Sequence, residues 1–159
     1  WRSRRKESSQ SPHAFIVDKL LYWSVQSANR DRVWVRIQNA IGIPKLDSVA
    51  EPDVSWVRKR DFSKTLPSPD DVLLVIEVSD STIRKDRGVK AKLYAEAGVQ
   101  DYWIINVNDS CVEVHRRPHG SRFQSIGTYN VGDVVSPLSA PEATLALADI
   151  VLGEGFLAE

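Results

Sequence analysis

The stretch VLLVIEVSDST, from Val72 to Thr82, constrains the fold more than any other part of the chain. Its apolar residues are mostly β-branched and run almost unbroken around a single carboxylate, Glu77. Such a run predicts a strand covered on both faces, as in parallel or mixed sheets. Side chains alternate along a strand, so Val75, Glu77 and Ser79 share one face and the apolar residues between them share the other. A buried carboxylate costs several kcal/mol without a partner, so Glu77 must meet a cation, a donor or a proton.

Length and composition favour one domain, residues 1–159, long enough to bury a substantial core. The chain is 42% hydrophobic and has no apolar stretch near the roughly 20 residues of a membrane span. Basic and acidic residues balance at 21 each, so nucleic acid would have to be met by a local basic patch. Cys111 cannot form an internal disulfide and is expected to be a buried or half-buried strand thiol, which fits a reducing cytoplasm. The chain begins at Trp1, so we expect its N-terminus to be truncated.

The order of predicted elements indicates an α/β fold, a mixed sheet flanked by helices. Ser11 is a candidate N-cap for a helix that reaches about Asn29, with Pro12 in its first turn. A second helix is expected from about Asp86 to Ala97, before Gly98, as part of a right-handed crossover between strands. Strands are predicted at 33–43, 52–57, 72–79, 101–107 and 111–117, a strand or hairpin at 121–133, connections at 44–52 and 58–71, a closing helix at 147–156, and a frayed start or edge strand at 1–10.

Residues outside the central strand could meet Glu77. Asp53 lies in a Pro-Asp pair at the start of a strand, and two carboxylates at neighbouring strand ends repel each other unless a divalent ion such as Mg²⁺ lies between them. Asp86, Lys90 and Tyr94 are spaced four apart, so they share one helix face. That helix follows the Glu77 strand, and Lys90 could orient or polarise a water molecule over the strand end.

Each of these residues also has a purely structural explanation. Glu77 could form an ion pair with Lys90 or with an arginine, and Asp53 could cap local amides. Asp86 could be a charge favoured near a helix N-terminus. Lys90 could be a solvated helix residue, and Tyr94 a core residue with its hydroxyl at the rim.

Several motifs in one order carry a resemblance to a known family. They are PDVSWV, VLLVIEVSDST, the D-x-x-x-K-x-x-x-Y spacing of Asp86, Lys90 and Tyr94, AGVQDYWIINV, and VEVHRR. Together they resemble a restriction endonuclease family, often called only a domain of unknown function, within the PD-(D/E)XK nuclease superfamily. The resemblance extends from Ser11 to the closing helix and implies a restriction-endonuclease-like fold.

The resemblance implies that Asp53, Glu77 and Lys90 are catalytic. Asp53 and Glu77 would be ligands of Mg²⁺ or Mn²⁺, and the main-chain carbonyl of Val78 a further ligand. The superfamily's lysine usually lies two residues after the acid, where this chain has Ser79. In this branch Lys90 matches the lysine, from the following helix.

Asp86 and Tyr94 match supporting positions of the family, and Ser79 is also expected to have a supporting role. Family members usually carry another acidic residue ahead of the SPH segment at Ser11, and this chain is expected to begin after it. A third acidic ligand is therefore unaccounted for. His13 is expected to cap the first helix or to lie on the surface, and His115 and His119 to be surface strand and turn residues.

The function implied is a metal-dependent DNA endonuclease that hydrolyses phosphodiester bonds in the cytoplasm, as a homodimer. One alternative is a degenerate nuclease fold used in nucleic-acid binding or protein assembly. Another is a structural homo-oligomer in which Tyr102 and Trp103 form an interface instead of core. DNA-backbone contacts are expected from basic clusters that could equally be solvated surface, namely Arg58, Lys59 and Arg60, and Arg84, Lys85 and Arg87.

Overall fold

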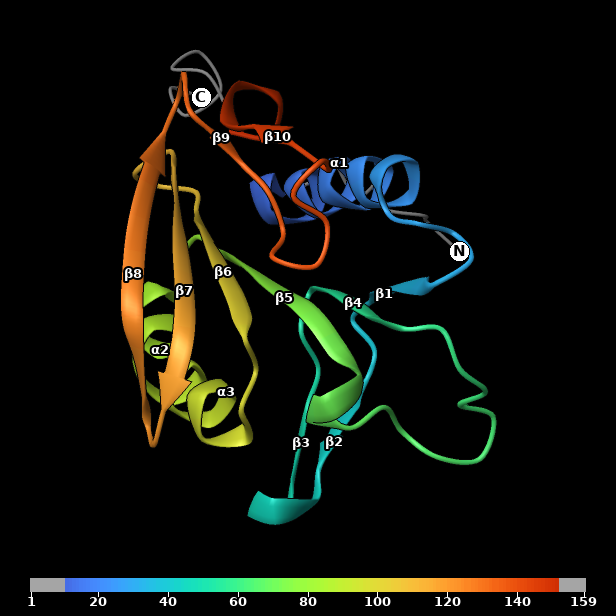
Figure 1. Ribbon diagram of the computed structural model, residues 1–159. Helices are drawn as coiled ribbons and strands as arrows, with labels where there is room; N and C mark the ends of the chain where they lie inside the picture. Colours follow the sequence, from blue (N-terminus) through green and yellow to red (C-terminus); the bar gives the residue numbers. More distant parts are fainter. Residues whose placement is uncertain (1–10, 152–159) are drawn as a thin grey trace, which may run out of the picture.

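A computed structural model describes residues 11–151 of the chain (Figure 1). Within this range the strands form a six-stranded sheet in the order β1-β4-β5-β6-β7-β8. β5 and β6 pair in parallel, and the other neighbours pair antiparallel, which confirms the predicted α/β fold with a mixed sheet. The strands of this sheet are β1 (Val33–Ile37), β4 (Val54–Arg58), β5 (Val72–Ser79), β6 (Asp101–Asn106), β7 (Cys111–His119) and β8 (Arg122–Asn130).

The first helix, α1 (Pro12–Ser27), begins as predicted. The Ser11 side chain caps it by accepting a hydrogen bond from the main-chain nitrogen of Ala14 at 3.2 Å. This bond satisfies one of the amides that a helix start leaves without an intrahelical partner. Ile16 and Leu20, spaced four apart, are completely buried on the face that packs against the sheet.

The sheet separates two hydrophobic cores, and β5 contributes to both because its side chains alternate. Leu74 and Ile76 face α1, whereas Val75 faces the helix that follows β5. Tyr102 and Trp103 of β6 are both 0% exposed and divide between the two cores. They are core residues and not interface aromatics. The Cys111 thiol is also buried, as predicted.

The helical segment after β5 differs from the predicted single helix. It begins at Ile83, three residues early, with α2 (Ile83–Lys85), continues as a π-helical turn (Asp86–Lys90) and ends as α3 (Ala91–Ala97). The predicted end is confirmed: Gly98 follows with φ 82°, a left-handed conformation that glycine adopts at little cost. Figure 1 shows α2 and α3 packed beside β6, β7 and β8.

The segment from 33 to 52 was predicted wrongly in part. The expected strand at 33–43 stops at Ile37, because Gln38 takes a positive φ of 46° and breaks the ladder. A hairpin follows, in which β2 (Ile41–Ile43) pairs with β3 (Ser48–Ala50) where a plain connection was expected.

β7 and β8 form a long hairpin. After this hairpin the described chain is mostly irregular, and the two-residue strands β9 (Val134–Val135) and β10 (Leu145–Ala146) pair with each other. The predicted closing helix begins as a 3₁₀ turn, Leu147–Asp149. Its remainder from residue 152, and the expected start at 1–10, lie outside the described residues. In the described part of the chain, no helix has the length and apolar character needed to cross a membrane.

Candidate active site

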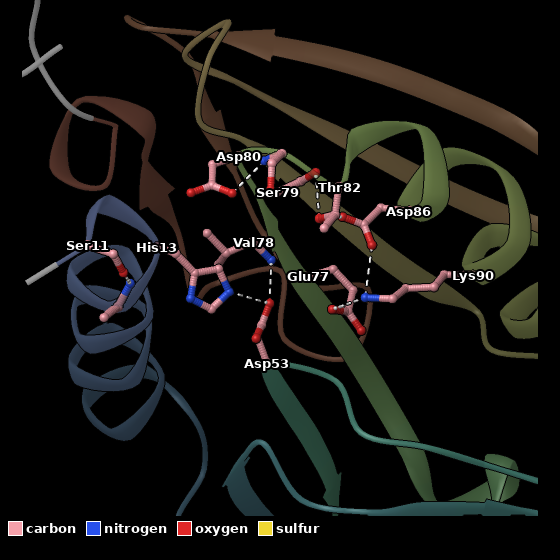
Figure 2. Close-up of polar contacts among 12 residues, drawn as sticks. Ser11, His13, Asp53, Glu77, Val78, Ser79, Asp80, Thr82, Asp86 and Lys90 are labelled. Carbon is pink, nitrogen blue, oxygen red and sulfur yellow. Dashed lines mark hydrogen bonds and ion pairs between the residues drawn. The ribbon is translucent and has the colours of Figure 1, made fainter.

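Glu77 lies near the end of β5, on the face that meets α3, and is only 3% exposed. Its two carboxylate oxygens have different partners. The ammonium group of Lys90 lies 3.0 Å from Oε2 (Figure 2). The Tyr94 hydroxyl donates a hydrogen bond of 3.0 Å to Oε1. These two contacts explain how the apolar strand accommodates a carboxylate.

The helical segment brings a second carboxylate to Lys90. Asp86 is completely buried, and its Oδ1 lies 2.9 Å from Lys90 Nζ. The two residues are four apart and share one face of the helical segment, as the spacing predicted. Its other oxygen, Oδ2, accepts a hydrogen bond of 2.8 Å from the Thr82 hydroxyl. Asp86 is the fourth residue of the helical segment, close enough to the helix N-terminus for its charge to be favoured there, and it makes these two side-chain contacts as well. Lys90 therefore bridges two buried carboxylates.

Asp53 lies immediately before β4, beside the last residues of β5. Val54 pairs with Ile76, so the backbone of Asp53 comes next to that of Glu77. Asp53 Oδ2 accepts a hydrogen bond of 2.8 Å from the Val78 main-chain nitrogen, the amide cap that a structural explanation expects. Nε2 of His13 lies 3.2 Å from the same oxygen.

His13 is the residue of this site that sequence reasoning missed. It was expected to cap α1 or to lie on the surface, but it reaches across to Asp53 from the first turn of the helix (Figure 2). Its place directly after the Ser11–Pro12 start of the helix gave no signal of this contact. The packing of α1 against β5 creates it.

The electrostatics of the site reflect burial opposed by charge. Burial raises the pKa of Glu77 to about 7, although Lys90 counteracts it; the negative charge of Asp53 adds to the rise. Burial lowers the pKa of Lys90, but the contacts with Asp86 and Glu77 outweigh burial and leave that pKa raised. Burial and the nearby Glu77 raise the pKa of Tyr94, which keeps its hydroxyl protonated as a donor. The site thus holds one cation among several carboxylates.

Ser79 and Val78 occupy less central places. Ser79 is buried on the Glu77 face, and its Oγ lies 3.3 Å from the hydroxyl oxygen of Thr82. It therefore contacts the residue that supports Asp86. The Val78 side chain belongs to the core on the α1 side, and its main chain reaches the site through the hydrogen bond with Asp53.

The two basic clusters are not brought together. Arg58 is the last residue of β4, and Lys59 and Arg60 follow it, beside the start of β5. Arg84, Lys85 and Arg87 come after the opposite end of β5. All six are exposed, but several have protein partners. Arg60 lies 3.4 Å from Asp71, and Arg87 lies 2.7 Å from Glu113.

The remaining histidines differ from each other. His119 is exposed at the tip of the β7–β8 hairpin, as expected for a turn residue. The prediction of a surface position for His115 is wrong, because its side chain is buried beside Tyr102 and Phe123. Nε2 of His115 lies 3.5 Å from Glu113. Burial lowers the pKa of His115, which favours the neutral ring.

Between residues 11 and 151, no group of three or more histidine, cysteine, aspartate or glutamate side chains is placed to hold a metal ion. Asp53 and Glu77 are a pair of carboxylates at neighbouring strand ends. Such oxygen donors are those that hard divalent cations prefer.

A mixed sheet that carries two carboxylates at adjoining strand ends, with a lysine delivered by the next helix, defines a restriction-endonuclease-like protein. Residues 3–148 match the family described as "Uma2: Putative restriction endonuclease". The chain belongs to this family, and the predicted family resemblance is confirmed.

A solved structure supports the same fold. It is described as a crystal structure of a "putative nuclease belonging to DUF820" from Anabaena variabilis ATCC 29413. The two chains are 20% identical and superimpose with a TM-score of 0.68, over 91% of this chain and 83% of the other. No curated protein matches the chain.

Proposed function

We propose that the protein is a metal-dependent DNA endonuclease that hydrolyses phosphodiester bonds, with Asp53, Glu77 and Lys90 as its catalytic residues. The observation that carries this proposal is the position of Lys90, whose ammonium group lies within 3.0 Å of two buried carboxylates, Glu77 and Asp86. Glu77 lies near the end of β5, which adjoins Asp53. A lysine placed against a phosphate can stabilise the charge that develops in phosphoryl transfer. The family of this chain supports the same reaction.

The donor set fits a divalent cation. Asp53 and Glu77 offer carboxylate oxygens, and the negative charge of Asp53 is one cause of the raised pKa of Glu77. A cation between the two would relieve this repulsion. Asp53, Glu77 and the Val78 carbonyl would hold Mg²⁺ or Mn²⁺, which supplies Lewis-acid stabilisation of a phosphodiester and lowers the pKa of bound water.

The protein's own groups hold and orient the charges. Lys90 keeps its proton through Asp86 and Glu77, and it faces the strand end as a cation that can orient an attacking water molecule or a phosphate oxygen. Tyr94 fixes the other oxygen of Glu77. His13 and the Val78 amide fix Asp53 from the opposite side.

We propose DNA as the substrate, contacted in part by the exposed basic clusters at 58–60 and 84–87. A homodimer in the cytoplasm stays a prediction. Two copies of one site would allow both strands of a duplex to be cut, and sedimentation of the purified chain with and without DNA would test it.

Plasmid cleavage in the presence of Mg²⁺ or Mn²⁺ tests the catalytic assignment. We expect the parent to nick or cut the plasmid, and Glu77→Ala and Lys90→Ala to lose activity by about a hundredfold or more, because each removes a charge from the reacting centre. Lys92→Ala is the matched control, since Lys92 lies on the same helix but is exposed and 3.9 Å from Glu96.

Circular dichroism would verify that the variants remain folded. Full activity in Glu77→Ala would end the assignment of this residue as catalytic. Loss of activity in Lys92→Ala to the same extent would show that changing any lysine of the helix has this effect.

A degenerate nuclease fold that binds nucleic acid without cutting it is the second candidate. One observation favours it: in the range 11–151, no group of three or more histidine, cysteine, aspartate or glutamate side chains is placed to hold a metal ion. Such a module need not gain stability from Mg²⁺ or Mn²⁺, whereas an occupied metal site stabilises the folded state. DNA binding without cleavage and without metal-dependent stabilisation would support this candidate over an endonuclease.

A further inference from the structure

A second feature lies beside the candidate active site, along the edge strand β1. Residues of β1 and of the segment after β4 line a hollow of about 690 Å³, which we call the β1 groove. Trp34, Arg36, Lys59, Arg60 and Phe62 are the lining residues that matter here.

Trp34 is 45% exposed, yet its indole is held in place. Its Nε1 donates a hydrogen bond of 3.0 Å to the Arg60 main-chain oxygen, and Lys59 Nζ lies 4.4 Å from its ring centroid. Large aromatic side chains are usually mostly buried, so an exposed indole that is fixed by a hydrogen bond at its edge and by Lys59 over one face offers a flat surface for stacking.

Cationic groups surround this indole. The Arg60 guanidinium lies 5.7 Å from the centroid of the half-buried Phe62 ring. Arg36 is anchored by one hydrogen bond of 2.8 Å, which its Nη1 donates to the Ala40 oxygen. Asp61 also lines the groove and brings one negative charge, since its carboxylate accepts a hydrogen bond of 2.8 Å from the Ser63 amide and stays ionised. Against it stand the three cations Arg36, Lys59 and Arg60. Of these, Lys59 also donates to the Arg30 oxygen, and Arg60 also lies 3.4 Å from Asp71. The groove therefore complements a negatively charged ligand.

Strand register places the groove on the same sheet face as Glu77. Arg36 pairs with Ser55, and Ser55 pairs with Val75, which shares its face with Glu77. Trp34 pairs with Val57, four residues along β4 from Asp53, or about 13 Å at the rise of a strand. The main-chain nitrogen of Gln38, directly after β1, donates a hydrogen bond of 3.0 Å to the main-chain oxygen of Asp53, so β1 leads directly to the candidate active site.

We propose that the β1 groove binds a single strand of DNA next to the cleavage site, with a base stacked on Trp34 and phosphates contacted by Arg36, Lys59 and Arg60. An aromatic platform within a cationic groove is how proteins bind single strands without reading their sequence. About 13 Å corresponds to roughly four stacked nucleotides. The inference rests on the proposed endonuclease function and names its substrate class: DNA with an unpaired strand, in preference to continuous duplex.

Fluorescence anisotropy of a labelled oligothymidylate, measured in EDTA so that no cleavage can occur, tests the groove on the full 159-residue chain. We expect the parent to bind it more tightly than a duplex of equal length. Trp34→Ala should weaken binding about tenfold, and Trp34→Phe should restore most of the loss. Tyr22→Ala is the matched control, because Tyr22 is another exposed aromatic, 69% exposed on α1, and its variant should bind like the parent.

Equal binding by Trp34→Ala and the parent, or a preference of the parent for duplex, would overturn the inference. Binding that depends on Trp34 in a protein that cuts no plasmid would support the groove although the endonuclease proposal fails. Cleavage that depends on Glu77, with oligothymidylate binding unaffected by Trp34→Ala, would overturn the groove and leave the endonuclease proposal standing.

Discussion

At the scale of single residues, Glu77 is a buried carboxylate whose two hydrogen-bond partners do not fully offset the loss of water. Burial is the main cause of its raised pKa of about 7, with Lys90 and Tyr94 acting in the opposite direction. A residue held in this state is costly for folding and is typical of functional sites. This pKa places the titration of Glu77 near neutral pH.

This raised pKa predicts a pH-dependent stability. Between about 4.5 and about 7 the folded state keeps the Glu77 proton while the unfolded state loses it, so the stabilisation is complete below this window and is lost as pH rises through it. The loss is on the order of 3 kcal/mol across the window. Urea unfolding of the parent and of Glu77→Gln should show that the free energy of unfolding falls more steeply with pH in the parent.

Glu51→Gln, a change at an exposed glutamate, is the control and should follow the parent. Parallel profiles for the parent and Glu77→Gln would contradict the shifted titration.

Residue spacing predicted much of the candidate site. Alternation along β5 placed Glu77 on one face, and the four-residue spacing placed Asp86 and Lys90 together, which the ion pair bears out geometrically. The contacts of His13 and His115 could not be predicted, because they depend on how α1 packs and on which face of β7 is covered. Such contacts follow from tertiary packing and leave no local pattern in the sequence.

At the scale of elements, the π-helical turn at Asp86–Lys90 departs from the regular helix that the spacing favours. The Asp86 carbonyl accepts a hydrogen bond from the Tyr102 hydroxyl at 2.9 Å and also from the Ala91 amide. A π turn inside an α-helix often marks a functional site, and here it contains both Asp86 and Lys90. The i, i+4 pattern persists through the turn, so the sequence could not reveal it.

Gly98 at the end of α3 gives a prediction at this scale. A Cβ atom there would meet nothing within 4 Å, so Gly98→Ala should destabilise only through its left-handed φ of 82°, by about 1 kcal/mol. Gly88, inside the π turn, has equal space and no positive φ. Gly88→Ala should therefore be neutral or stabilising by up to about 1 kcal/mol.

Thermal or urea denaturation of both variants checks the opposite signs. A larger loss in Gly88→Ala than in Gly98→Ala would mean that the π turn itself cannot tolerate a methyl group.

The β2–β3 hairpin shows why element boundaries escaped prediction. Ile41 and Ile43 continue the apolar alternation of β1, so the sequence reads as one strand. In the structure they are buried in the core on the α3 side, paired with β3. The break at Gln38 depends on a single positive φ in a residue that seldom adopts one.

At the scale of the whole molecule, the candidate site lies where both layers meet one end of the sheet. His13 reaches Asp53 from the α1 layer, and Lys90 reaches Glu77 from the layer of α3 (Figure 2). The parallel pairing of β5 with β6, predicted from the intervening helix, brings that helix over the end of β5. The predicted order of elements therefore placed this helix beside β5, although it could not place the edge strand β1.

Metal binding should appear as stability of the whole chain. If Asp53 and Glu77 hold a divalent cation, the ion binds the folded state alone and raises the free energy of unfolding by about 2.7 kcal/mol at a hundredfold excess over its Kd. Bound metal requires ionised Glu77, so the gain should be full above pH about 7 and should shrink below it as the proton competes. Melting curves of the parent with and without Mn²⁺ or Mg²⁺, at pH values on both sides of this point, measure the effect.

Asp53→Ala and Glu77→Ala should each abolish the metal-dependent rise in Tm, whereas Glu51→Ala, which removes an exposed carboxylate, should retain it. This readout needs no DNA and no turnover, so it separates a loaded metal site from the choice of substrate. A parent whose Tm does not change with either ion at alkaline pH would contradict the metal site and favour the non-cleaving module. A rise that persists in Glu77→Ala would place the ion elsewhere on the protein, because the carboxylate that binds it must then be a different one.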